Sequence, residues 1–238
     1  MGKKGTVLVV RMDPPTGKEA EWNNWYDKEH IPSRLALPGF LAIRRFELAP
    51  GLPESFVVPG PKYLTVIELA SRDAAKSKEF ISLRRQEADL PSDSFEVMNN
   101  NLPNRFAGVF EQIFPEGEEY RIPDDAKFLL AVGHADLPPE VIDEYNAWYN
   151  MEHIPSYLEI PGVLNARRFM LAKGSSGIPS GVSGPQFIAL YDLANDKVFE
   201  TQEFKQKSST PWSSRVRGWT WSRRKMNNMY RCIYTARR

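Results

Sequence analysis

The sequence contains two long segments that repeat each other without a gap. Residues Glu21–Ala49 and Glu144–Ala172 are identical at 18 of 29 aligned positions. Each copy contains the nine-residue signature Trp-Tyr-x-x-Glu-His-Ile-Pro-Ser, at 25–33 and at 148–156. Self-similarity of this kind indicates a structural unit that occurs twice. A chain with this sequence is therefore expected to fold as two copies of one module.

The 123-residue offset between the copies extends beyond the signature in both directions. The apolar runs 6–12, 63–69 and 106–112 lie over 129–135, 186–192 and 229–235. The stretch 115–125 is polar and flanked by prolines, which is typical of a linker. We expect a first module at residues 1–115 and a second at residues 125–238.

Each module is predicted to run strand, helix, strand, strand, helix, strand. The opening strands are apolar at consecutive positions, so both of their faces should be buried. The first helix carries aromatic residues at spacings of three and four and should end by about Ile31, because a residue before proline avoids the helical region. This order is that of the split βαβ, or ferredoxin-like, arrangement. The predicted fold class is α+β, with two ferredoxin-like βαββαβ modules packed sheet to sheet.

Composition excludes several classes of protein. No apolar run approaches the ~20 residues of a membrane-spanning helix, and no secretory signal is present. The single cysteine, Cys232, cannot form an intramolecular disulfide, which favours a reducing cytoplasmic location. Three dispersed histidines and one cysteine give no zinc-type spacing, so no metal site is expected.

Charge is unevenly distributed along the chain. Residues 205–238 contain ten Lys or Arg and no Asp or Glu, although the whole chain carries a net charge of only +1. A basic surface with tryptophans could bind nucleic acid or a small anion. The favoured interpretation is that this segment pairs with the acidic remainder of the chain or with a second copy. We therefore expect no nucleic-acid partner, no membrane partner, and a homodimer as one oligomeric option.

The extended motif Trp-Tyr-x-x-Glu-His-Ile-Pro-Ser-x-Leu-x-x-Pro-Gly-x-Leu-x-x-Arg-Arg-Phe occurs at 25–46 and 148–169. It resembles the dimeric α+β barrel superfamily, most closely its EthD-like members. The resemblance implies that the tandem duplication builds within one chain the barrel that most members form by dimerisation. That superfamily includes isomerases, cyclases, lyases, cofactor-free monooxygenases, haem enzymes and accessory proteins, and fold alone does not choose among them.

The resemblance also implies where a small aromatic substrate would bind, namely in a cleft between each sheet and its helices. Histidine is a proton acceptor near neutral pH, tyrosine a donor, and tryptophan a stacking surface. The candidate catalytic residues are His153, His30, His134, Tyr149 and Tyr26. The candidate substrate-binding residues are Trp148, Trp25, Trp22, Tyr145, Tyr157, Glu152 and Glu29.

A structural interpretation of the same motif is equally open. Both copies keep the glutamate, the histidine and two arginines, although one active site would need them once. Glu29 is expected to pair with Arg44 or Arg45, and Glu152 with Arg167 or Arg168, because the following strand lies under the helix. In this interpretation each histidine binds the last carbonyl groups of its helix.

Differences between the copies then carry more information than identities. In the 123-residue register His134 lies over Arg11, and Tyr157 lies over Arg34. Because His134 and His153 could divide acid and base roles, the second module is the preferred location of a single active site.

The predicted function is a cofactor-independent enzyme acting by proton transfer on a small aromatic, phenolic or polyketide-like molecule, as a lyase, dehydratase, cyclase or isomerase. The alternatives are a cofactor-free quinol monooxygenase and a non-catalytic binding or accessory protein. A haem bound through one histidine is a lesser alternative.

Overall fold

A computed structural model describes residues 5–117, 120–135, 137–173, 184–219 and 224–238. Eight antiparallel strands form one closed barrel in the order β1-β3-β2-β8-β5-β7-β6-β4. The bounds in the first half are β1 Thr6–Met12, β2 Phe40–Leu48, β3 Tyr63–Leu69 and β4 Phe106–Phe114. Those in the second half are β5 Phe128–His134, β6 Val163–Leu171, β7 Phe187–Leu193 and β8 Arg224–Arg237. Hydrogen bonding between β2 and β8, and between β4 and β6, joins the halves.

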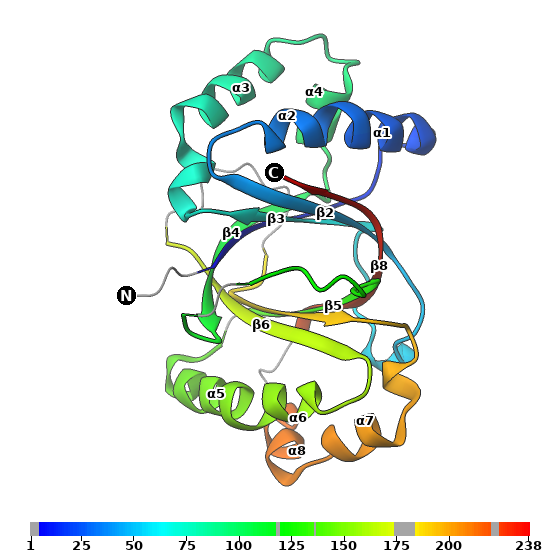
Figure 1. Cartoon of the computed structure of the whole chain (residues 1–238), viewed down its shortest axis with the longest axis vertical. Coiled ribbons are helices and arrows are strands. Elements are labelled where there is room, and N and C mark those ends of the chain that lie inside the picture. Colours follow the sequence, from blue (N-terminus) through cyan, green and yellow to red (C-terminus); the bar gives the residue numbers. More distant parts are fainter. Residues whose placement is uncertain (1–4, 118–119, 136, 174–183, 220–223) are drawn as a thin grey trace.

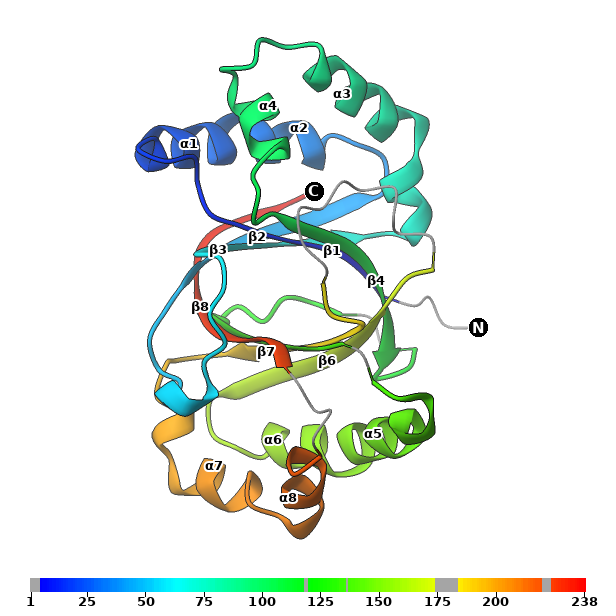
Figure 2. The same cartoon turned by 180° about the vertical axis from the view of Figure 1, so that it is seen from behind.

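The helices lie on the two outer sides of the barrel (Figures 1 and 2). Four cover the strands of the first half: α1 Glu19–Trp25, α2 Ile31–Leu35, α3 Lys78–Ala88 and α4 Phe95–Asn100. Four cover the second half: α5 Ile142–Trp148, α6 Ile154–Leu158, α7 Gln202–Lys207 and α8 Pro211–Arg217. None of the described helices is long and apolar enough to span a membrane.

Proline does not end the first helix of either half, so that prediction was wrong. Tyr26–His30 forms a π-helical turn between α1 and α2, and Tyr149–His153 forms the same turn between α5 and α6. The amide of Ile31 donates to the carbonyl of Tyr26, five residues back. Because a π turn is wider than an α turn, it relieves the clash that Pro32 would otherwise make with the preceding turn.

Strand register shifts all three predicted equivalences of the flanking strands. Residues 6–12 correspond to 128–134, residues 63–69 to 187–193, and residues 106–111 to 226–231. Phe40 and Val163 are aligned in the repeat, and they pair with Leu69 and Leu193 respectively. Those partners pair in turn with Thr6 and Phe128. Counting along each strand from there, His134 corresponds to Met12 and not to Arg11. A slip of one residue moves a side chain to the opposite face of a strand.

The two faces of the sheet therefore hold different residues at these positions. Arg11 faces the barrel interior, where it donates to Tyr230 and Asn228. His134 faces the helices, where its Nδ1 lies 3.0 Å from the hydroxyl of Tyr145 on α5. By the same register Tyr191 corresponds to Ile67.

The barrel interior is an apolar core to which both halves contribute, including Val9, Phe46, Phe110, Phe169 and Leu190. Two further apolar clusters lie between the sheet and the helices, one in each half. Because the interior core is shared, the two sets of four strands bury one apolar face together, as sheet-to-sheet packing requires.

Buried ion pairs connect the halves near one end of the interior. Arg44 donates to Asp192 at 2.7 Å, and Arg167 donates to both oxygens of Glu68 at 2.7 and 3.0 Å. The predicted pairs with Glu29 and Glu152 were wrong. Arg45 binds Asp27 and Asn23, while Arg168 binds Asn150 and Asn146. The reason is that the strand presents its two arginines to opposite faces, and neither faces the two glutamates.

The basic C-terminal segment pairs with acidic residues elsewhere in the chain, as expected. Lys207 pairs with Glu159, Arg215 with Glu144, and Arg231 with Glu47. These side chains are 24–63% exposed to solvent, so each pair contributes at most ~1 kcal/mol to stability.

Candidate active site

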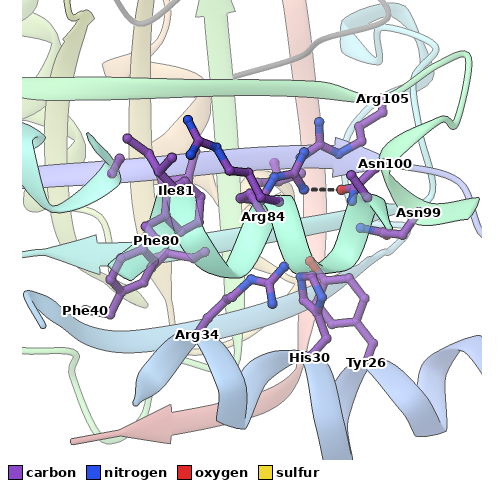
Figure 3. A pocket seen from close by; sticks show the side chains of 16 residues that line it. Tyr26, His30, Arg34, Phe40, Phe80, Ile81, Arg84, Asn99, Asn100 and Arg105 are labelled. Carbon is purple, nitrogen blue, oxygen red and sulfur yellow. Dashed lines mark hydrogen bonds between the residues drawn. The ribbon is translucent and has the colours of Figure 1, made fainter. Parts of the chain in front are cut away.

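A cavity of about 330 Å³ lies between the strands of the first half and the helices α2, α3 and α4. This is near the lower end of the ~300–1,000 Å³ found for small-molecule sites. Figure 3 shows Phe40, Phe80 and Ile81 towards one end and Tyr26, His30 and Arg105 towards the other. Leu8, Val10 and Ile67 add apolar surface from the strands. The cavity is therefore apolar at one end and polar at the other.

His30 reaches this cavity from the π-helical turn. Its ring lies 4.8 Å from the ring of Trp25 and 4.5 Å from that of Tyr26, measured between centroids. Its Nδ1 is buried and has no hydrogen-bond partner in the described part of the chain. Burial and the guanidinium groups of Arg34 and Arg105 hold the pKa of His30 well below its ordinary value. The imidazole is thus neutral at pH 7, and in the absence of a ligand it is a weaker base than an exposed histidine.

The polar end also contains guanidinium groups. Arg34 forms a two-point ion pair with Glu87, at 2.5 and 2.7 Å. Arg84 donates to Asn100 (Figure 3) and lies 3.8 Å from Glu87. Burial and the neighbouring Arg84 lower the pKa of Arg105 to about 10. Positive charge is therefore concentrated beside His30.

The second half has an equivalent cavity, but its volume is only about 50 Å³. Leu130, Val132, Tyr149 and His153 line it, as Leu8, Val10, Tyr26 and His30 line the first cavity. Three equivalent lining positions differ in side-chain size or type. Tyr157 replaces Arg34, Tyr191 replaces Ile67, and Phe199 replaces Ala75.

The two additional phenol rings of the second half lie 5.8 Å apart, and Tyr157 also contacts His153 at 4.1 Å between centroids. Arg34 instead extends towards Glu87. The two tyrosines therefore occupy space that is open in the first half, and Phe199, Leu52 and Phe56 narrow the second cavity further.

The candidate residues of the second half form a packed aromatic cluster. The ring of His153 stacks on Trp148 at 4.3 Å. His134 and His153 both line the small cavity. Burial, with a smaller effect of Arg224, lowers the pKa of His134 to about 3. Burial likewise raises the pKa of Tyr149.

Several candidate substrate-binding residues do not line the cavity beside His30. Trp22 is fully buried and packs against Tyr26. Trp25 donates to Glu96 at 2.9 Å. Glu29 is exposed in an open surface depression. Glu152 accepts a hydrogen bond from Thr210 at 2.7 Å, beside the start of α8. Of the first-half candidates, only Tyr26 and His30 contribute to the cavity wall.

No sequence pattern pointed to Arg84, Asn99 and Arg105, which complete the polar end of the cavity. They lie on α3, on α4 and immediately before β4. This region has no counterpart in the repeated signature, and α4 lies between the second predicted helix and the last strand, where no helix was predicted. Only the fold brings it over His30.

Within the described residues, no group of three His, Cys, Asp or Glu side chains is placed to bind a metal ion. A single-histidine haem does not fit either. The cavity beside His30 is near the lower limit for drug-sized ligands, and the space beside His153 is smaller still.

No family model and no curated protein matches the sequence. Solved structures do match over nearly the whole chain. An anthrone oxidase-like protein is 14% identical, with a TM-score of 0.60, over 99% of this chain and 93% of its own. A candidate chlorite dismutase is 14% identical, with a TM-score of 0.56, over 97% and 95%. A candidate monooxygenase from Fusobacterium nucleatum is 10% identical, with a TM-score of 0.54, over 100% and 96%. At these identities the likeness concerns the fold, and this chain has the fold of the dimeric α+β barrel proteins.

Proposed function

We propose that this chain is an enzyme that moves a proton on a small aromatic, phenolic or polyketide-like molecule bound in the first-half cavity. The observation that carries the proposal is the difference between two equivalent sites: about 330 Å³ beside His30 and about 50 Å³ beside His153. Both sites keep the histidine and the tyrosine, but only the first leaves room for a ligand. The first half therefore replaces the second as our preferred location of the active site.

His30 is the proposed base. It is neutral at pH 7, it borders the cavity, and its Nδ1 is buried without a partner among the described residues. Proton abstraction would leave negative charge on the substrate next to Arg34 and Arg84. In a site with little water, fixed positive groups near the developing negative charge stabilise the transition state and so lower the energy barrier of the step. Proton transfer of this kind is typical of a lyase, dehydratase, cyclase or isomerase, and it requires no cofactor.

The test is exchange of acidic C–H protons for deuterium in a panel of phenolic ketones and 1,3-diketones, followed by NMR. His30→Gln should reduce exchange by ~10²–10⁴-fold, the usual contribution of a positioned base. His153→Gln is the matched control and should retain exchange. Thermal unfolding of both variants separates lost chemistry from lost folding. Equal exchange in both variants and the parent protein would refute the role of His30.

A cofactor-free monooxygenase is the second candidate. The names of two structural neighbours, an anthrone oxidase-like protein and a candidate monooxygenase, support it at the level of the fold. Oxygen consumption with an added quinol, in the absence of deuterium exchange, would favour this candidate. Saturable binding of the panel without either activity would favour a non-catalytic accessory protein.

We further propose that residues 1–115 and 125–238 are duplicated ferredoxin-like modules of EthD-like ancestry. The strand orders β4-β1-β3-β2 and β8-β5-β7-β6 support the duplication, and the repeated signature supports the ancestry. A homodimer of the chain stays a prediction, which sedimentation analysis would test.

A further inference from the structure

The cavity wall carries more positive charge than its neighbourhood balances. The described residues that line it include the arginines at 34, 84, 85 and 105 and no Asp or Glu. Glu87, just outside the lining, forms a bidentate pair with Arg34 and is 3.8 Å from Arg84. The single carboxylate of Glu87 thus interacts with two guanidinium groups, and the guanidinium group of Arg105 lines the same cavity. In a partly buried site such an excess favours an anionic ligand.

A buried amide at the same end adds an independent indication of a ligand. The side chain of Asn99 lines the cavity and is only 2% exposed, and its Oδ1 has no hydrogen-bond partner in the described part of the chain. A buried polar atom without a partner is costly and calls for one. Because Oδ1 is a hydrogen-bond acceptor, the ligand group beside it must be a donor, such as a hydroxyl, and lies next to the group that the arginines bind.

The opposite end of the cavity accepts an apolar group. The rings of Phe40 and Phe80 lie 5.5 Å apart, and Ile67 and Leu8 continue this surface along the strands. A molecule that satisfies both ends has an apolar ring on one side and an ionised oxygen group on the other. A carboxylate matches the forked geometry of guanidinium groups better than a single oxygen does.

We propose that the first-half cavity binds a small aromatic carboxylate, with the carboxylate against Arg84 and Arg105 and the ring against Phe40 and Phe80; the inference rests on the proposed function for its site and adds the class of substrate. The bound anion also offsets the cationic field at His30. Burial is the main cause of the low pKa of His30, and the cationic field lowers it further, so binding of an anion would raise the basicity of His30.

The test is calorimetric titration of the full chain with 1-naphthoate and with its neutral isostere 1-naphthamide. The expected result is binding of the acid about tenfold or more tightly than the amide, since hydrogen bonds to charged groups support such a ratio. Arg84→Gln should remove most of this preference by weakening the acid alone. Lys207→Gln, which changes a basic residue of α7 on the other side of the barrel, is the control and should bind both probes as the parent protein does.

Asn99→Asp provides a second variant with nearly unchanged shape. The added negative charge should weaken 1-naphthoate and leave 1-naphthamide little changed. Equal affinity for acid and amide, an unaltered preference in both cavity variants, or no binding of either probe would overturn the inference. Titration measures binding without turnover. A retained acid preference with no deuterium exchange would therefore refute the proton-transfer proposal alone, and exchange without an acid preference would refute this one alone.

Discussion

Replacing Asp192 by Asn should destabilise the protein far more than an ordinary loss of surface charge. Asp192 and Arg44 come from different halves, their side chains are 3% and 2% exposed, and the N–O distance is 2.7 Å. The hydroxyl of Tyr120 bridges them, accepting from Arg44 and donating to Asp192. The amide keeps the shape of the carboxylate and removes its charge. Arg44 is then left as an uncompensated buried cation, which costs ~3–5 kcal/mol.

A loss of this size is a large share of the ~5–15 kcal/mol that stabilises a typical domain. Urea unfolding, followed by tryptophan fluorescence and far-ultraviolet circular dichroism, measures it. Glu159→Gln is the matched acid-to-amide control at an exposed ion pair and should change stability by less than ~1 kcal/mol.

A double-mutant cycle with Arg44→Met separates the buried charge from the lost pair. Arg44→Met together with Asp192→Asn should recover much of the loss, because removing both charges leaves no buried cation. A loss below ~1 kcal/mol in Asp192→Asn, or no recovery in the double variant, would refute the reasoning. Glu68→Gln should behave like Asp192→Asn, since it leaves Arg167 in the equivalent position.

Two further predictions concern the histidines and the filled cavity. The free energy of unfolding should fall as pH drops from 7 to 5, because burial keeps the folded-state pKa of His134 at about 3 and that of His30 and His153 well below normal. The unfolded chain takes up protons first, near pH 6.5, and each imidazole adds up to ~1.4 kcal/mol per pH unit to the slope of the unfolding free energy against pH. His134→Gln should lower the measured slope by one such increment. An unchanged slope would contradict the lowered pKa of His134. The double variant Tyr157→Arg/Tyr191→Ile should open the second cavity and raise the 1-naphthoate stoichiometry in calorimetry from one towards two, whereas an unchanged stoichiometry would show that other groups fill it.

The sequence alone determined the repeat, the order of the eight strands with a helix after the first and third strand of each half, and the burial of the opening strands. These features depend on local patterns: apolar runs, helical spacing of aromatic residues, and turns at Pro38-Gly39 and Pro161-Gly162. It also identified His30 and Tyr26, which do line the cavity. The fate of Pro32 was harder to predict, because a π turn depends on the geometry of the whole helix.

Tertiary structure decided which of the equivalent positions form a site. A one-residue difference in strand register placed His134 with the helices and Arg11 inside the barrel, and a constant offset in the sequence hides such a slip. The partners of Arg44 and Arg167 come from the opposite half, beyond the reach of any local pattern. The histidine is repeated in both halves, but the cavity beside it is open in only one of them. The difference depends on the volume of side chains that come together only in the fold, where Tyr157 and Tyr191 of the second half replace Arg34 and Ile67 of the first.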